Sequence, residues 1–283
     1  MSEIQFSGLF DLTDKVAVIT GGSRGLGLYT ATAFLHAGAR KVILVSRKAE
    51  GPQGLNQAVQ KLNALPLHGE AISIAADLSK PSEVERVVEH LKKTEEKIDI
   101  LIANAAATWG GRFDETPDWA VAKVLDLNVR SVFNLVRLMA PLLEKAGKIG
   151  DPSRIVITGA GAGLMVPPFG PENRVISYGV SKAAAHHLAR YLAVELGPRN
   201  IATNAIAPGF FPSKLANGLV DILGGFDAMA KANLLGRYGR PEDIAGVMLF
   251  LCSRAGSWVN GVVLEVTGGS HLVGDRPPSK SKL

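Results

Sequence analysis

Tyr178 and Lys182 are four residues apart and could together move a proton to or from a substrate. They lie in the segment Ser177-Tyr178-Gly179-Val180-Ser181-Lys182, which opens a long stretch typical of a helix. Residues four apart share one face of a helix, so both side chains are expected to point the same way. A nearby ammonium favours the phenolate and lowers the pKa of a tyrosine from about 10. The pair therefore predicts a general acid–base for a carbonyl or an alcohol.

A glycine-rich turn, Thr20-Gly21-Gly22-Ser23-Arg24-Gly25-Leu26-Gly27, follows the apolar run 15–20. Its glycines permit a tight turn and let backbone amides approach a pyrophosphate, whose charge is favoured at the N-terminus of the next helix. The match alone is weak, but its position between an apolar strand and the helical stretch 28–36 is typical of a dinucleotide site. We expect a nicotinamide dinucleotide here, contacted by Gly21, Ser23, Arg24, Gly25, Leu26 and Gly27.

The residues after the second apolar run bear on which nicotinamide dinucleotide binds. NAD-selective sites place a carboxylate there, which accepts hydrogen bonds from the ribose hydroxyls. Here the run ends Val45-Ser46-Arg47-Lys48 without an acid, and Arg24 lies in the glycine turn. A guanidinium can grip a 2′-phosphate, whereas a carboxylate repels it. The sequence therefore favours NADP(H), with Ser46 and Arg47 among its contacts; the alternative is that these cations are solvated surface groups.

Short apolar runs alternate with longer amphipathic segments along the chain. The runs predict strands at 15–20, 41–46, 71–75, 98–103, 154–158, 201–207 and 262–266, and the other segments predict helices that include 83–93, 119–144, 178–196 and 242–252. This alternation predicts an α/β fold with a single doubly wound, Rossmann-type parallel sheet of about seven strands and helices on both faces. Ligands then bind at the carboxyl ends of the strands, and 210–236 is expected to form a lid or substrate-binding arm.

Composition narrows the function classes. The net charge of +5 comes from basic residues spread along the chain, apart from a cluster in the last few, and no basic run is interleaved with aromatic residues. We therefore expect no nucleic-acid partner. Cys252 is the only cysteine, which excludes an internal disulfide and favours a reducing compartment. Neither a secretory signal nor an apolar stretch of about 20 residues is present, so membrane insertion is not expected.

Across residues 10–272 the chain resembles the short-chain dehydrogenase/reductase family. The resemblance rests on the glycine turn, Asp77-Leu78, Asn104-Ala105, Asn128, Tyr178 with Lys182, Asn204 and Pro208-Gly209. The segments 178–188 and 206–213 are most similar to rhamnolipid-type 3-oxoacyl reductases of bacteria and their fungal relatives. The resemblance implies one dinucleotide-binding domain over residues 1–272 and a homo-tetramer (or dimer) formed through the helix 178–196 and the last helix and strand.

The resemblance also implies roles for individual residues. Tyr178 is the proton donor and Lys182 orients the ribose, while Asn128 holds the water of a proton relay to Lys182. Asp77 and Leu78 lie against the adenine, and Asn104 frames the cofactor. Further cofactor contacts are implied at Ala105, Pro208, Gly209, Phe211 and Ser213.

Two stretches depart from the family pattern. The motif Asn-Asn-Ala-Gly after the fourth strand reads Ala103-Asn104-Ala105-Ala106. The family's catalytic serine lies three residues before a glycine, and alignment on Gly163 places Ala160 at that position. The serine donates a hydrogen bond to the substrate oxygen, and losing such a donor costs about 3 kcal/mol of barrier. Thr158, Ser177 or a substrate group are the candidate replacements, and the segment 164–177 is longer than usual, enough to reshape the site.

The last residues read Ser279-Lys280-Ser281-Lys282-Leu283, so the chain ends in S-K-L. This is the peroxisomal address, read by an import receptor at a free C-terminus. We expect 273–283 to be a flexible tail that keeps the address accessible, and the protein to be peroxisomal. The alternative is a chance basic tail.

Three functions stay open. The first is an NADPH-dependent reductase of a 3-oxoacyl or polyketide-like ketone, working with Ala160 in place of serine. The second is altered chemistry on the same fold: enoyl or imine reduction, isomerisation or cyclisation. The third is a non-catalytic cofactor-binding subunit. His186 and His187 have no further ligand at metal spacing, so we interpret them as structural and expect no metal site.

Overall fold

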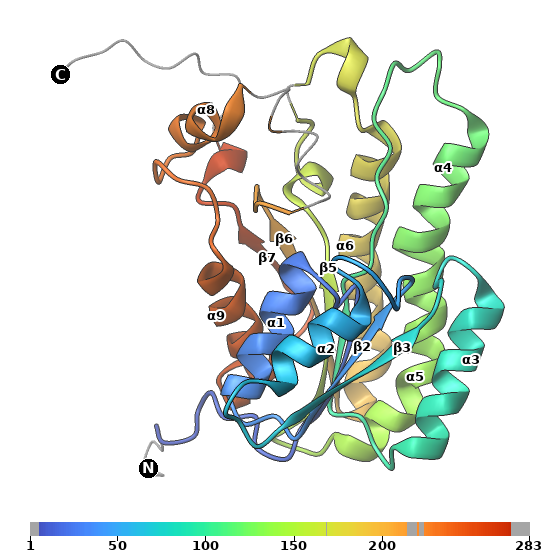
Figure 1. Cartoon of the computed structure of the whole chain (residues 1–283), viewed down its shortest axis with the longest axis vertical. Helices are drawn as coiled ribbons and strands as arrows, with labels where there is room; N and C mark the ends of the chain where they lie inside the picture. Colours follow the sequence, from blue (N-terminus) through green and yellow to red (C-terminus); the bar gives the residue numbers. More distant parts are fainter. Residues whose placement is uncertain (1–5, 168, 214–219, 221–223, 273–283) are drawn as a thin grey trace.

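The computed structural model describes residues 6–167, 169–213, 220 and 224–272, and a seven-stranded sheet forms its centre (Figure 1). Its order is β3-β2-β1-β4-β5-β6-β7, and all six strand pairings are parallel. The strands are β1 (Val16–Thr20), β2 (Lys41–Ser46), β3 (Glu70–Ala75), β4 (Ile100–Ala103), β5 (Ser153–Thr158), β6 (Ile201–Pro208) and β7 (Val263–Val266). The predicted fold class is thus confirmed, with every predicted strand present within a few residues of its expected bounds.

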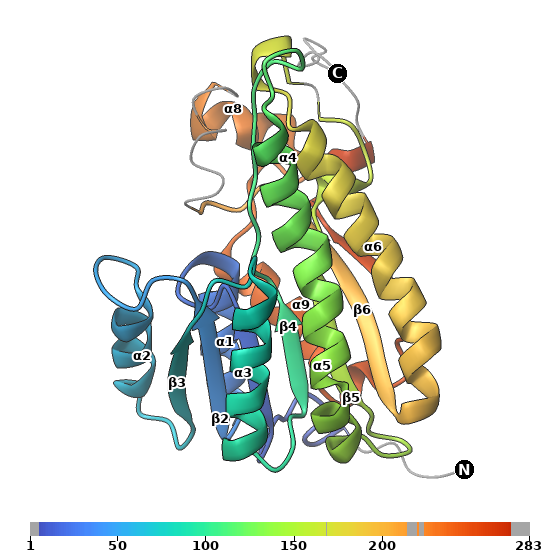
Figure 2. The ribbon, with the colours of Figure 1, turned by 90° about the vertical axis from the view of Figure 1, so that its right-hand side faces the viewer.

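Helices cover both faces of this sheet, as Figures 1 and 2 show. One face packs against α1 (Gly25–His36), α2 (Leu55–Asn63) and α9 (Pro241–Cys252). The other packs against α3 (Pro81–Thr94), α5 (Ser131–Ala146) and α6 (Ile176–Leu196). Helix α2 was not among the predicted helices, although its buried residues Leu55, Ala58 and Leu62 have helical spacing.

Strand residues alternate between the two core clusters because successive side chains point to opposite faces of a sheet. Val16 and Val18 of β1 lie in the cluster with α3, α5 and α6. Ala17 and Ile19 lie in the cluster with α1, α2 and α9. Burial on both faces is why these strands read as continuous apolar runs. The same alternation sets the face of the sheet to which each side chain at the end of β5 points.

The helix predicted over 119–144 is interrupted. It consists of α4 (Asp118–Leu125), a π-helical turn (Asp126–Arg130) and α5. A π turn inserts a residue into the i→i−4 pattern, and such turns are frequent at functional sites. Asn128 lies within this turn and is buried. The predicted helix is thus present over its full length, and its α-helical pattern changes to a π turn at the residue for which a catalytic role was expected.

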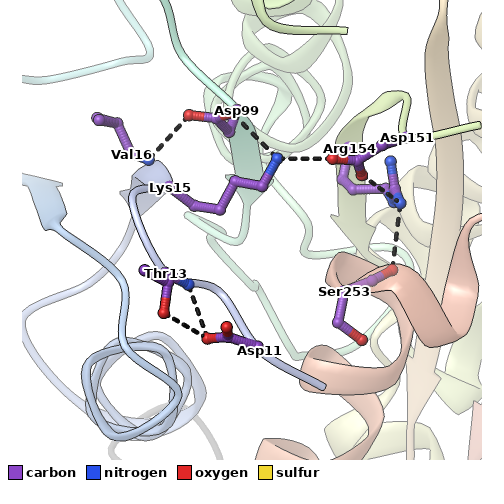
Figure 3. A network of polar contacts seen from close by, with 8 residues as sticks. All are labelled: Asp11, Thr13, Lys15, Val16, Asp99, Asp151, Arg154 and Ser253. Carbon is purple, nitrogen blue, oxygen red and sulfur yellow. Dashed lines mark hydrogen bonds and ion pairs between the residues drawn. The ribbon is translucent and has the colours of Figure 1, made fainter. Parts of the chain in front are cut away.

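A network of charged side chains lies at the amino end of the sheet (Figure 3). The Asp99 carboxylate accepts the backbone N–H of Val16 at 3.0 Å and lies 3.4 Å from Lys15 Nζ. Lys15 also pairs with Asp151 at 2.9 Å, and Asp151 lies 3.3 Å from the guanidinium of Arg154. Arg154 and Asp99 are both almost fully buried. Opposite charges thus join β1, β4 and β5 at this end.

The segment 210–236 was expected to form a lid or arm, and its described part contains α8 (Gly225–Ala232). In Figure 1, α8 lies near the carboxyl ends of the strands. After α8, the Asn233 amide donates to the backbone oxygen of Thr267 at 2.8 Å, which ties this segment to the turn after β7. The tail 273–283, with its S-K-L sequence, lies outside the described residues.

Candidate functional site

The predicted cofactor residues lie at the carboxyl ends of β1 to β6, which form one edge of the parallel sheet. Between β1 and α1, the glycine turn brings backbone into contact with backbone. A Cβ atom on Gly27 would lie 2.5 Å from the Gly21 backbone oxygen, so only glycine fits. The N-terminus of α1 therefore lies close over the end of β1, the arrangement in which backbone amides can bind a pyrophosphate.

Asn104 and Thr20 lock this turn to the end of β4. The Asn104 amide donates to the Thr20 backbone oxygen at 3.0 Å and to the Gly21 oxygen at 3.4 Å. The Thr20 hydroxyl accepts the backbone N–H groups of Asn104 and Ala105, each at 2.9 Å. The structure thus places Asn104 and Ala105 beside the glycine turn, as expected for residues that frame a cofactor.

Two arginines near the end of β2 have no acidic partner among the residues that the structure describes. The hydroxyls of Ser23 and Ser46 are 3.4 Å apart and join the glycine turn to this strand. Arg24 and Arg47 are both exposed, and neither forms an ion pair within the described part of the chain. Free guanidinium groups beside two hydroxyls suit the 2′-phosphate of NADP(H).

The remaining predicted cofactor residues lie along the same edge. Asp77 accepts the backbone N–H and the hydroxyl of Ser79 in the turn after β3, and Leu78 is buried beside it. After β6, Ser213 lies close to the glycine turn, because a Cβ on Gly25 would be 3.5 Å from its Cβ. Phe211 differs: its ring is buried in the core and a Cβ on Gly239 would lie 2.3 Å from it, so packing is its observed role.

Tyr178 and Lys182 lie side by side on α6. The Nζ atom of Lys182 is 5.6 Å from the centroid of the Tyr178 ring and donates to the backbone oxygen of Thr158 at 2.7 Å. Burial raises the pKa of Tyr178 to about 12 and lowers that of Lys182 to about 8. The expected lowering of the Tyr178 pKa is therefore wrong for this structure, because the ammonium bonds to a carbonyl and burial dominates.

Asn128 holds the loop after β4 against α6. Its side-chain oxygen accepts the Ala107 N–H, and its amide donates to the Ala107 oxygen, both at 2.8 Å. The amide also donates to the Ser181 hydroxyl at 2.9 Å, and this hydroxyl donates to the Tyr178 backbone oxygen at 2.7 Å. Both amide protons are thus used inside the protein, so the side chain positions Tyr178; its role in a water relay stays a prediction.

Among the described residues of β5, no hydroxyl points toward α6 to take the part of the serine that the family resemblance implies at position 160. Ala160 is nearly buried at the start of the short turn after this strand. By strand alternation, Thr158 shares the face of Val156, which packs against the α1–α9 side, whereas α6 covers the other face. The Thr158 hydroxyl is buried and makes no hydrogen bond to any described residue. Ser177, directly before Tyr178, is only half-buried and stays available.

His186, which the sequence interpretation took as structural, lies beside the candidate site. It is buried on α6, one turn after Lys182, and its Nε2 accepts the backbone N–H of Ala160 at 3.3 Å. Its spacing was a usable signal, since residues four apart share a helix face and Lys182 was already assigned. His187, the next residue, is exposed and contacts the Tyr191 ring.

The long segment after β5 is joined to the loop after β4. The Gly111 N–H donates to the Arg174 backbone oxygen at 3.1 Å, and the Arg112 guanidinium lies 3.0 Å from the Glu172 carboxylate. Trp109, in the same loop, packs edge-on against Trp119 of α4. The loop after β4 and the described part of the segment before Tyr178 are thus joined to each other.

The described ranges contain no group of three or more His, Cys, Asp or Glu side chains that could hold a metal ion. In the same ranges, none of the helices combines the length and the apolar character needed to cross a bilayer.

Comparison with known proteins agrees with this geometry. A family model described as enoyl-(acyl carrier protein) reductase matches residues 21–271. The rhamnolipids biosynthesis 3-oxoacyl-[acyl-carrier-protein] reductase of Pseudomonas aeruginosa is 35% identical, over 93% of this chain and 98% of its own. The 7alpha-hydroxysteroid dehydrogenase of Escherichia coli is 34% identical, over 91% and 94%. The short-chain dehydrogenase/reductase PhomF of Diaporthe leptostromiformis is 30% identical, over 94% of both chains.

Solved structures give the same result. The Pseudomonas aeruginosa RhlG/NADP active-site complex superposes with a TM-score of 0.85 at 35% identity and covers 94% of this chain and 100% of that one. A short-chain dehydrogenase from Burkholderia cenocepacia in complex with NADP superposes with a TM-score of 0.79 at 30% identity, over 92% and 98% of the two chains. These relatives, together with the glycine turn and the pair Tyr178 and Lys182, show that this chain belongs to the short-chain dehydrogenase/reductase family of oxidoreductases.

Proposed function

We propose that this oxidoreductase reduces the ketone of a 3-oxoacyl or polyketide-like substrate with NADPH. The observation that carries the proposal is Tyr178 beside Lys182 at the edge where the free cations Arg24 and Arg47 lie. Relatives of known structure hold NADP, and one curated relative is a 3-oxoacyl reductase. NADP(H) is accordingly the cofactor, and the identity of the ketone is the proposed part.

The proposed reaction needs a phenol that keeps its proton until the carbonyl arrives. When bound, NADPH would supply a hydride for the carbonyl carbon. Tyr178, whose pKa is raised to about 12 by burial, donates its proton to the carbonyl oxygen and leaves an alcohol. Lys182 holds the end of β5 against α6 through its bond to the Thr158 oxygen, and Asn128 holds α6 in place through Ser181.

The substrate is proposed to be apolar beyond its ketone. The two joined loops carry Phe113 and Val166, large apolar side chains that are exposed. Such side chains suit an acyl chain or a polyketide better than a sugar or a small acid, because they bury apolar area on binding.

Turnover of a ketone panel tests this proposal. Purified wild type is assayed with NADPH against 3-oxoacyl thioesters, diketides and simple ketones, in parallel with Ala160→Ser. Oxidation of NADPH that depends on a 3-oxoacyl substrate supports the proposal. Wild type that reduces no ketone, beside an Ala160→Ser variant that does, would contradict it and favour a disabled enzyme.

Enoyl reduction is the second candidate. It is favoured by the family model, whose description names an enoyl reductase, and by Ala160, which leaves the carbonyl of a saturated ketone one hydrogen bond short. Enoyl thioesters in the same panel separate the two reactions. The third possibility, a non-catalytic cofactor-binding subunit, predicts NADPH binding by calorimetry without turnover of any substrate.

A homo-tetramer (or dimer) is also proposed. Val180, Tyr191 and Val194 on α6 are large apolar or aromatic residues that a monomer exposes to solvent. Sedimentation velocity of the full chain tests this, and a single monomeric species at micromolar concentration would overturn it.

Peroxisomal import through Ser281-Lys282-Leu283 is proposed from the sequence. An amino-terminal fluorescent fusion should accumulate in peroxisomes, and the same fusion without these three residues should not. Equal distribution of the two fusions would contradict the proposal.

A further inference from the structure

The imidazole of His186 fills the space beneath the loop 159–163. A Cβ atom on Gly159 would lie 1.9 Å from His186 Nε2, and one on Gly163 would lie 2.9 Å from its Cε1. The histidine is 3% exposed. The ring therefore lies directly against the backbone of this loop, and both glycines are needed to make room for it.

A backbone hydrogen bond joins this ring to the loop. The backbone N–H of Ala160 donates to His186 Nε2 at 3.3 Å. The other ring nitrogen, Nδ1, is buried and has no partner among the described residues. Since Nε2 accepts, the ring proton of the neutral form is on Nδ1. Burial and the positive charges of Lys182 and Arg190 lower the pKa of His186 to about 4, so the accepting form prevails near neutral pH.

The same helix face carries the catalytic groups. Tyr178, Lys182 and His186 follow one another at intervals of four residues on α6. Lys182 bonds to the backbone of Thr158, and His186 bonds to the backbone of Ala160. Two successive turns of one helix thus hold the end of β5 and the loop that follows it.

Ala160 offers a methyl group where a serine would donate a hydrogen bond. A methyl group can align a substrate only by shape, so the position of the loop backbone sets how the carbonyl meets Tyr178. A shift of about 1 Å in the position of the carbonyl relative to Tyr178 can lower the rate about 10²-fold.

We propose that His186 is a positioning residue, which holds the loop 159–163 and thereby sets the place of the substrate carbonyl against Tyr178. The proposal rests on the proposed carbonyl reduction. It assigns to the Nε2 acceptor a role that an apolar side chain of similar volume could not fill.

Leucine and glutamine at position 186 test the acceptor separately from packing. His186→Leu fills much of the ring volume without an acceptor, whereas His186→Gln offers an amide oxygen at similar reach. We expect His186→Leu to lower kcat for the ketone about 10-fold to 10²-fold with the KM for NADPH changed by less than about threefold, and His186→Gln to retain most of the activity. His187→Leu, at the exposed neighbouring histidine, is the matched control.

A second measurement does not depend on ketone turnover. Hydrogen exchange of the Ala160 amide, followed by NMR, should speed up in His186→Leu and stay slow in His186→Gln and His187→Leu. Fast exchange in His186→Leu without any ketone activity in wild type would support the positioning role while the proposed function fails. Unchanged exchange, or full activity of His186→Leu, would overturn the positioning role itself. Equal loss in the leucine and glutamine variants would also overturn it.

Discussion

The two ends of the sheet bury charged groups in opposite ways. At the amino end, Asp99 and Arg154 are almost fully buried and lie in a network of opposite charges with Lys15 and Asp151 (Figure 3). At the carboxyl end, Lys182 is just as buried, but its bonded partner is a backbone carbonyl. At the amino end the buried charges face charges of opposite sign, although Nε and Nη1 of Arg154 make no hydrogen bond to a described residue; at the carboxyl end the buried ammonium bonds to a neutral carbonyl.

The pKa values follow this difference. Burial alone raises the pKa of Asp151, but the hydrogen bond from Lys15 and the charges of Lys15 and Arg154 lower it overall, so the carboxylate stays ionised. Burial moves Lys182, His186 and Tyr178 toward their neutral forms, with pKa values of about 8, 4 and 12. Paired buried charges contribute to structure, whereas unpaired titratable groups with shifted pKa values are typical of catalytic sites.

Tyr178→Phe should have the largest effect. Removing the proton donor is expected to lower kcat about 10³-fold, within the range for general acid catalysis, while NADPH affinity and thermal stability change little. Tyr191→Phe, on the exposed side of the same helix, is the control and should leave kcat unchanged. A Tyr178→Phe enzyme with more than a tenth of wild-type kcat would show that another group donates the proton.

Asp99→Asn, at the amino end of the sheet, should lower stability and leave activity unchanged. Breaking a buried charge pair is expected to lower the free energy of unfolding by about 3–4 kcal/mol, measured by urea denaturation, with kcat/KM of the folded enzyme unchanged. Asp114→Asn, which alters an exposed carboxylate, should change stability by less than about 0.5 kcal/mol. Loss of activity in folded Asp99→Asn would contradict the claim that the charges at the amino end contribute to stability alone.

Acid should weaken the protein through His186. Its pKa is about 4 when folded and about 6.5 when unfolded, so between these values the unfolded chain binds the extra proton. The neutral histidine therefore contributes fully to the free energy of unfolding above pH 6.5. As the pH falls toward 4, the free energy of unfolding decreases by up to about 2–3 kcal/mol. His186→Gln should lack this decrease. Parallel stability curves of wild type and variant between pH 7 and pH 4.5 would contradict the buried neutral histidine.

The unpaired arginines should matter only for the phosphorylated cofactor. Replacing Arg24 and Arg47 together by alanine is expected to raise the KM for NADPH about 10-fold to 10²-fold and to leave the KM for NADH within about twofold. The free energy involved is smaller than for the buried groups because both side chains are exposed. Equal changes for the two cofactors would mean that these guanidinium groups do not meet a 2′-phosphate.

Local pattern was enough to predict most of the fold. Apolar runs predicted all seven strands, because strands buried on both faces leave a continuous signal. The glycine turn, Tyr178 and Lys182 were predicted because their spacing along the chain is itself the functional geometry. Helix α2 could also have been found, since its buried residues repeat with helical spacing.

Features that depend on distant contacts could not be predicted. The π turn at Asn128 exists where that side chain bonds to Ala107 and Ser181, and the apolar periodicity runs through it. The raised pKa of Tyr178 depends on the burial of the phenol and on the acceptor to which Lys182 donates its hydrogen bond. The four-residue spacing from Lys182 places His186 on the same face of α6, but its contact with Ala160 depends on where β5 ends.

Deuterium transfer tests the central claim most directly. Wild-type enzyme is incubated with a 3-oxoacyl thioester and NADPH deuterated at nicotinamide C4, and the product is analysed by mass spectrometry and NMR. The account predicts a 3-hydroxyacyl product with deuterium on the former carbonyl carbon, and none with Tyr178→Phe over the same time. Bound NADPH with no deuterium in any product would contradict it.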